Sequence, residues 1–127
     1  MSTLTKVLEK NVAEIEKNAD MKEGRFRLGY HLMPPVGWLN DPNGLCWYKG
    51  KYHVFFQYAP FDVEGGLKFW GHYTSVDLVD WKYEGTALYP DSPYDCHGVY
   101  SGSALVEDEK MHLFFTGNVK IDGDYDY

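Results

Sequence analysis

The spacing of hydrophobic residues divides the chain into a helical start and a longer β-rich part. Between residues 3 and 19, apolar side chains recur three or four positions apart, with lysines and glutamates between them: Leu4, Val7, Leu8, Val12 and Ile15. This spacing predicts an amphipathic α-helix, capped by Thr3 or Thr5. We expect its apolar face to pack against the rest of the domain, and a partner-binding or dimerising helix is the less favoured alternative.

From residue 45 onward the hydrophobic period changes to two, which is typical of β-strands. Strands are predicted at residues 45–48, 52–58, 69–76, 81–83, 99–106 and 111–116. Residues 49–51 and the charged segment 107–110 predict hairpin turns. The fold class is therefore all-β. The pattern alone favours a sandwich and a propeller about equally, and two four-stranded units could cover residues 38–117.

The segment Trp38-Leu39-Asn40-Asp41-Pro42-Asn43-Gly44 combines an aromatic side chain, amides, a carboxylate and turn-forming residues. Its last four residues predict a type I β-turn, with Asp at the first corner, Pro at the second and Gly closing the turn. Pro42 also disfavours helical backbone at Asp41. The sequence thus predicts a rigid corner that presents the Asp41 carboxylate, either as part of a site or as a turn alone.

Composition narrows the possible functions. Aromatic residues make up 17% of the chain, and 13 glycines and 6 prolines add turns, which favours β architectures and carbohydrate surfaces. The formal net charge of −7 argues against nucleic acid and anionic membranes as partners. No apolar run approaches the roughly 18 residues of a membrane span, and the charged N-terminal segment lacks the apolar stretch of a signal peptide. We therefore expect a cytoplasmic protein.

Cysteine and histidine usage predicts neither a disulfide framework nor a metal site. Cys46 and Cys96 are the only cysteines, and both are expected to be reduced, buried and inert. Four histidines match no metal-ligand motif, and core or rim positions are expected for them: His53, His72, His97 and His112. We therefore expect no metal and no cofactor.

Four segments carry a family resemblance: WLNDPNG at 38–44, YHVFFQYAP at 52–60, WGHYTSVDLVDW at 70–81 and VYSGSA at 99–104. Because the four segments occur in this order, the chain resembles the N-terminal portion of the β-fructofuranosidases, the invertase and fructanase family of glycoside hydrolases (family 32). The lead-in at residues 30–37 makes it most similar to the bacterial intracellular sucrose-6-phosphate hydrolases. The resemblance implies a five-bladed β-propeller. Residues 1–24 would be the helix and lead-in, and residues 25–127 about the first two blades.

The resemblance also implies a reaction and residue roles. The family cleaves β-fructofuranosidic bonds with retention, here of sucrose 6-phosphate or sucrose, through a fructosyl-enzyme on the carboxylate that corresponds to Asp41. A short fructan is a further possible substrate. Around the sugar the resemblance places Trp38, Leu39, Asn40, Gln57, Trp70, Tyr100 and Ser101.

Several of these residues have simpler alternatives. Gln57 shares a predicted strand face with His53 and Phe55 and could simply face solvent. Ser101 could occupy a β-bulge, and the two tryptophans could be core residues.

Two features depart from the family pattern. Tyr100 stands where Phe is common, and the loop Glu64–Lys68 lacks the Trp that many secreted invertases have there. No role is therefore carried over to Gly65. Without that Trp, the side of the substrate site formed by this loop would be lower, and with Lys68 on it the site suggests room for a phosphorylated glucosyl unit.

The family's Arg-Asp-Pro and Glu-Cys motifs do not occur in these 127 residues. Without a transition-state carboxylate and a general acid, the chain by itself is expected to be inactive. Two other functions stay open: an arabinan-type furanosidase and a non-catalytic carbohydrate-binding propeller. A structural β domain with an incidental turn is the least favoured interpretation, because the four motifs occur in the family order.

Overall fold

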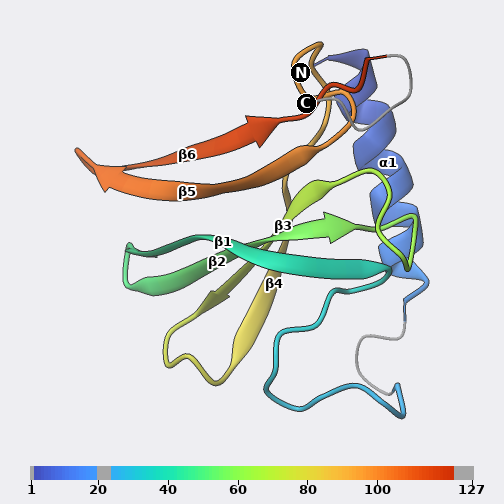
Figure 1. The fold of residues 1–127 in the computed structure, drawn as a ribbon. Coiled ribbons are helices and arrows are strands. Elements are labelled where there is room, and N and C mark those ends of the chain that lie inside the picture. The colour runs from blue at the N-terminus through green and yellow to red at the C-terminus, as the bar shows by residue number, and fades with distance from the viewer. Residues whose placement is uncertain (1, 20–23, 122–127) are drawn as a thin grey trace.

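The computed structural model describes residues 2–19 and 24–121. Its helix and strands are α1 (Thr3–Lys17), β1 (Trp38–Tyr48), β2 (Lys51–Ala59), β3 (Phe69–Ser75), β4 (Trp81–Leu88), β5 (Val99–Glu107) and β6 (Lys110–Gly117). The first four strands form an antiparallel meander in the order β1-β2-β3-β4, and β5 and β6 form a separate hairpin (Figure 1). The all-β class is therefore confirmed. Within the described residues neither sheet closes on itself.

Helix α1 begins at a different cap from the one predicted. The Ser2 side chain accepts a hydrogen bond from the Thr5 backbone N–H at 3.0 Å, so the predicted Thr3 or Thr5 cap is wrong. Thr5 lies one turn inside the helix, where its hydroxyl donates to Asp91 Oδ2 at 2.5 Å and ties the helix to the loop after β4. Val12 is 2% exposed and packs on the sheet together with the partly buried Leu8, but Leu4 (47% exposed) and Val7 (48%) lie largely in solvent. Only part of the predicted apolar face is therefore turned inward.

The two faces of the four-stranded sheet bury different clusters. Toward α1 lie Phe56, Tyr58, Phe69 and Tyr73. On the opposite face Phe55 and Trp70 pack against Val99, at the start of β5. The hairpin β5–β6 therefore covers the second face, separate from the helix (Figure 1).

The alternation along β2 decides which side chains reach the hairpin. Phe55 stacks on His72 of β3, with ring centroids 4.2 Å apart, and His72 in turn stacks on His53. Gln57 reaches Ser101 of β5 from the same face. The prediction that His53, Phe55 and Gln57 share one face is confirmed.

The segment that was predicted to be a turn is instead part of a strand. Residues 38–48 pair with β2 on both sides of two irregularities in register. At the first, Asn40 and Asp41 together oppose the single residue Gln57, which is the two-against-one count of a β-bulge. At the second, Gly44 adopts φ 54, a left-handed conformation that suits Gly. The type I turn is wrong because β2 supplies a partner strand before and after the segment, so the chain does not reverse.

Other strand predictions are confirmed or corrected by pairing. The hairpin turns at Lys49–Gly50 and Asp108–Glu109 are confirmed, with positive φ at all four residues. The fourth strand runs to Leu88 rather than ending at residue 83, because it continues to pair with β3 beyond two register shifts, as far as Leu88 opposite Trp70. The second four-stranded unit is wrong, since described residues 99–117 form a two-stranded hairpin only.

The thiols also differ from expectation. Both cysteines are free, but Cys96 is exposed, in the loop before β5, and not buried as predicted. Cys46 is partly buried, and this burial raises the pKa of its thiol.

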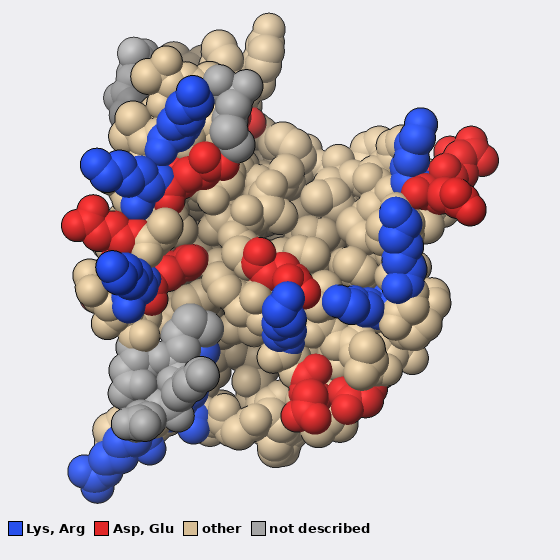
Figure 2. All heavy atoms as spheres, turned by 180° about the vertical axis from the view of Figure 1, so that it is seen from behind, with Lys and Arg blue, Asp and Glu red and all other residues tan. Residues whose placement is uncertain are grey.

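Basic and acidic side chains are mixed on one face of the molecule. No helix in the described part of the chain is long and apolar enough to cross a membrane. On the face drawn in Figure 2, Lys and Arg side chains lie beside Asp and Glu side chains, over the helix and near the hairpin turns. Basic residues are thus interspersed with acidic ones on that face.

Candidate active site

Three of the predicted site residues form one hydrogen-bonded group between the sheet and the hairpin. Ser101 Oγ donates to Asp41 Oδ2 at 2.8 Å and accepts from Gln57 Nε2 at 3.0 Å. They come from β5, β1 and β2 respectively. Gln57 is 4% exposed, whereas Asp41 is exposed. The protein therefore holds one carboxylate oxygen of Asp41 and leaves the group accessible to a ligand.

Ser101 reaches Asp41 because it also sits in a β-bulge. Tyr100 pairs with Thr116 and Gly102 pairs with Phe115, so Ser101 is an extra residue of β5. Bulges redirect side chains and are frequent beside active sites. The simpler alternative for Ser101, a bulge residue, is confirmed, and the bulge is what aims the hydroxyl at Asp41.

Asn43 joins the two bulges, and the sequence had assigned it only to a turn. It is 3% exposed. Its Nδ2 donates to the Asp41 backbone carbonyl at 3.0 Å, and its Oδ1 accepts from the Gly102 N–H at 3.1 Å. The sequence offered one signal for this role: WLNDPNG contains a second amide, Asn43, besides Asn40.

The structure places two of the predicted sugar contacts, Trp70 and Leu39, away from Asp41. Trp70 is 0% exposed, and its indole N–H donates to the Tyr100 carbonyl at 3.0 Å, so it supports β5 from within the core. Leu39 is partly buried against the cluster beside α1, on the other face of the sheet. Asn40, by contrast, is exposed next to Asp41 in the bulge.

Trp38 and Tyr100, two further predicted site residues, line a hollow of about 470 Å³. The ammonium of Lys68 lies 5.3 Å from the centre of the Trp38 ring and 5.4 Å from that of the Tyr100 ring. Burial, and then the neighbouring Lys120 charge, lower the pKa of Lys68, while Asp62 acts in the opposite direction. The hollow therefore has aromatic walls and is lined by charges of both signs, those of Lys68, Lys120 and Glu64.

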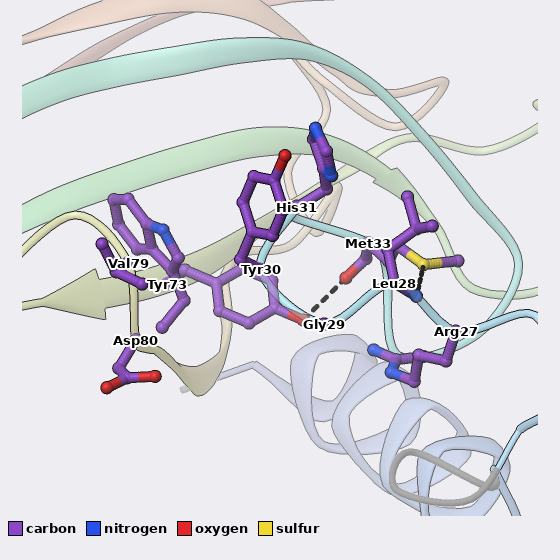
Figure 3. A pocket seen from close by; sticks show the side chains of 10 residues that line it. Arg27, Leu28, Gly29, Tyr30, His31, Met33, Tyr73, Val79 and Asp80 are labelled. Atoms are coloured by element: carbon purple, nitrogen blue, oxygen red, sulfur yellow. Dashed lines mark hydrogen bonds between the residues drawn. The ribbon is translucent and has the colours of Figure 1, made fainter.

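A second hollow, of about 400 Å³, lies between the lead-in and strands β3 and β4. Figure 3 shows Tyr73 donating to the Met33 carbonyl at 2.7 Å, beside Tyr30 and Arg27. None of the predicted sugar-binding residues lines it. It is therefore separate from the candidate active site.

The histidines at the sheet centre are satisfied by one another and by backbone. His53 Nε2 lies 3.2 Å from the Tyr48 carbonyl, which can only accept, so His53 Nδ1 accepts from His72 Nε2 at 3.0 Å. Burial, followed by the proximity of His53, lowers the pKa of His72 to about 4. Their predicted place in the core or rim is confirmed. Within the described residues no three His, Cys, Asp or Glu side chains are grouped to hold a metal ion.

The arrangement of the strands defines a class of protein. A four-stranded antiparallel meander followed by the first hairpin of a new sheet is the arrangement of consecutive blades in a β-propeller. In this chain a carboxylate, an amide and a hydroxyl meet where the two sheets adjoin. Residues 31–126 match the family model described as glycosyl hydrolases family 32 N-terminal domain. The chain therefore belongs to glycoside hydrolase family 32.

Relatives agree with this assignment. The sucrose-6-phosphate hydrolase of Bacillus subtilis is 52% identical over 108 residues, which are 84% of this chain and 22% of that protein. The structure of sucrose-6-phosphate hydrolase from Lactobacillus gasseri superposes with a TM-score of 0.78 at 41% identity, over 89% of this chain and 23% of that one. The structure of a Bombyx mori β-fructofuranosidase superposes with a TM-score of 0.81 at 38% identity, over 94% of this chain and 25% of that one. The chain thus spans about a quarter or less of the proteins that it matches.

Proposed function

We propose that the full-length protein carrying this chain is a retaining β-fructofuranosidase that hydrolyses sucrose 6-phosphate or sucrose. The observation that carries the proposal is the exposed Asp41 carboxylate, held through one oxygen by Ser101 and positioned in a bulge opposite Gln57. The names of the relatives, sucrose-6-phosphate hydrolase and β-fructofuranosidase, support the same reaction. We also propose that the protein is cytoplasmic.

Asp41 has the geometry of a nucleophile. Ser101 donates to Oδ2, so Oδ1 is the oxygen available to attack the anomeric carbon of the fructosyl unit. The bond from Oδ1 to that carbon forms as the bond to the leaving oxygen breaks, and the leaving oxygen takes a proton from a general acid. That acid belongs to the Glu-Cys motif, which these 127 residues lack. Water then releases fructose from the ester on Asp41.

The neighbouring side chains are proposed to hold the sugar. Asn40 is exposed beside Asp41 and offers both donors and an acceptor to hydroxyl groups. Trp38 and Tyr100 present aromatic surface to the hollow that they line, where sugar C–H groups can pack. Gln57 and Ser101 are proposed to contribute through the hydrogen bonds that they make to each other and to Asp41.

The proposed division of the chain is residues 1–24 for the helix and lead-in and 25–127 for the first part of the catalytic propeller. Glu16 of α1 accepts hydrogen bonds from Tyr58 and Tyr83 of the sheet, at 3.0 and 2.7 Å. Among the described residues, the helix is thus bonded to the sheet and packs on it as part of the same body.

Replacing Asp41 tests the function. We expect Asp41→Asn in the full-length protein to lower kcat for sucrose 6-phosphate by about a million-fold, the order seen when a catalytic nucleophile is removed. Asp108→Asn is the matched control, because Asp108 lies in the β5–β6 turn at φ 48, which Asn tolerates. Trapping with a slow fructosyl substrate, followed by peptide mass spectrometry, should place the adduct on Asp41. Sugar binding without turnover by the unmodified protein would instead indicate a carbohydrate-binding propeller, and an adduct on another carboxylate would refute the assignment.

A further inference from the structure

The β5 bulge that carries Ser101 is bonded to the four-stranded sheet at three successive residues. A bulge interrupts the regular ladder between its two strands, so pairing with β6 does not by itself fix the position of the extra residue. Side chains of β1, β2 and β3 each make one of the three bonds, at 3.0 or 3.1 Å: Asn43 to Gly102, Gln57 to Ser101 and Trp70 to Tyr100. The first sheet therefore locates the bulge.

Trp70 and Gln57 reach adjacent residues of β5 because they oppose each other in the sheet. They are direct partners in the antiparallel register of β2 and β3, and the side chains of such partners lie on the same face. The Trp70 indole N–H donates to the Tyr100 carbonyl. This carbonyl belongs to the planar peptide group that leads into Ser101, so fixing it orients the backbone from which the Ser101 side chain departs.

The burial of Trp70 separates its packing from its hydrogen bond. Trp70 is 0% exposed, and its ring centroid lies 5.8 Å from that of Phe55 and 6.3 Å from that of Phe115. Another aromatic side chain would make much of this apolar contact, but a Phe ring has no N–H to donate. The bond to the Tyr100 carbonyl is thus a contribution that packing alone does not require.

The Ser101 hydroxyl carries the effect on to Asp41. A serine hydroxyl has one proton, and the Gln57 amide nitrogen can only donate, so Ser101 Oγ accepts from Gln57 and gives its proton to Asp41 Oδ2 at 2.8 Å. A shift of the hydroxyl by about 1 Å would break this bond. Asp41 would then lose the contact that holds one of its oxygens.

We propose that Trp70 is a positioning residue for the nucleophile; this rests on the proposed function. Its indole N–H holds the peptide group before Ser101, the Ser101 hydroxyl holds Asp41 Oδ2, and Oδ1 is left to attack. Trp70 has no exposed surface and does not touch the sugar, which differs from the contact that the family resemblance implies. Misalignment of a nucleophile raises the barrier of the chemical step, so the effect belongs to kcat rather than KM.

A double-mutant cycle in the full-length protein tests the route through Ser101. For whichever of the two sugars is hydrolysed faster, we expect Trp70→Phe to lower kcat by about ten- to a hundred-fold and to change KM by less than about threefold. In a Ser101→Ala background the same substitution should change kcat by less than about twofold, because the hydroxyl through which it acts is gone. An unchanged kcat, or an equal fall in both backgrounds, would overturn the proposal.

A matched control and an isostere exclude a general effect of losing an indole. The Trp81 indole N–H also donates to a backbone carbonyl, that of Leu78, at 3.2 Å in the turn between β3 and β4. Trp81→Phe should therefore leave kcat unchanged. Benzothienylalanine in place of Trp70 keeps the shape of the indole and has sulfur instead of the N–H. It should reproduce the fall in kcat, and full activity of this variant would overturn the proposal.

A structural measurement decides the matter independently of catalysis. In a crystal structure of the Trp70→Phe full-length protein, we expect Ser101 Oγ to lie more than about 3.5 Å from Asp41 Oδ2. A distance that stays at 2.8 Å would overturn the positioning role. If the unmodified protein hydrolyses neither sugar, the proposed function fails, and this distance still shows whether Trp70 positions Ser101 against Asp41.

Discussion

Asn43 is the side chain on which the placement of Asp41 most depends. One buried amide bonds the backbone of the β1 bulge and the backbone of the β5 bulge at once. Because Asp41 and Ser101 lie in these two bulges, a change at Asn43 alters both without touching either side chain. Asn43 is therefore a positioning residue rather than a group that meets the sugar.

Substitution of Asn43 should separate positioning from folding. We expect Asn43→Ala to lower the free energy of unfolding by about 1–3 kcal/mol, because the two hydrogen bonds of this buried amide, to the Asp41 carbonyl and from the Gly102 N–H, are lost. It should also lower kcat in the full-length protein by more than tenfold with a smaller change in KM, because Asp41 loses its alignment. Asn43→Asp keeps an acceptor for Gly102 but buries a carboxylate against the Asp41 carbonyl, so it should lower both stability and activity. An unchanged kcat in the folded Ala variant would show that Asn43 is structural only.

At the scale of elements, one carboxylate accepts two of the hydrogen bonds that attach α1 to the sheet. Glu16 Oε1 accepts from the hydroxyls of Tyr58, which has no exposed surface, and Tyr83. Burial raises the pKa of both phenols, and the nearby Glu16 charge raises it further, so both stay protonated and donate at neutral pH. The helix is thus held by polar bonds as well as by its apolar face.

Removing this carboxylate should weaken the helix–sheet contact. We expect Glu16→Ala to lower the free energy of unfolding by about 2–4 kcal/mol, because two tyrosine hydroxyls lose their partner in a buried setting. Glu16→Gln keeps an acceptor and should lose less. Glu14→Ala, on the exposed side of the same helix, is the control. Denaturant titration of the purified variants measures the differences, and equal midpoints for the Glu16 and Glu14 variants would contradict the assignment.

At the scale of the whole molecule, the chain presents one four-stranded sheet and the start of another. Apolar side chains of the hairpin remain open to solvent, among them Leu105 (49% exposed), Phe114 (56%) and Phe115 (40%). Propeller blades bury such surfaces against their own outer strands and against the next blade. The hairpin is thus suited to pack against further β structure.

The isolated 127-residue chain should not release fructose from either sugar. Asp41, Ser101 and Gln57 are present, but the chain contains neither an Arg-Asp-Pro nor a Glu-Cys motif. Loss of the general acid and of the transition-state carboxylate removes several kcal/mol of stabilisation from the reaction. A coupled assay for glucose and fructose on the purified chain, with the full-length protein as positive control, measures this. Detectable release by the chain alone would refute the prediction.

Local patterns in the sequence were sufficient for the helix, the strand faces, the two hairpin turns and the family. Each depends on residues a few positions apart: the spacing of Val12 and its neighbours, the alternation around Phe55, and the four motifs in their order. The identities of Asp41, Gln57 and Ser101 as members of one group also followed from those motifs. The period of a helix or strand is set locally, which is why it can be predicted without the fold.

Tertiary structure alone decided which way the important side chains point. The segment around Pro42 and Gly44 that predicts a turn instead contains two irregularities within β1, because β2 is present to pair with the chain on either side. Trp70 faces the core and Leu39 the helix because their strands are packed on both faces, and no local pattern distinguishes those faces. Lys68 and Lys120, 52 positions apart, meet only because β5 and β6 bring their segments together. The direction of each of these side chains is set by strand pairing and by packing between elements, and neither can be read from residues that are neighbours in the sequence.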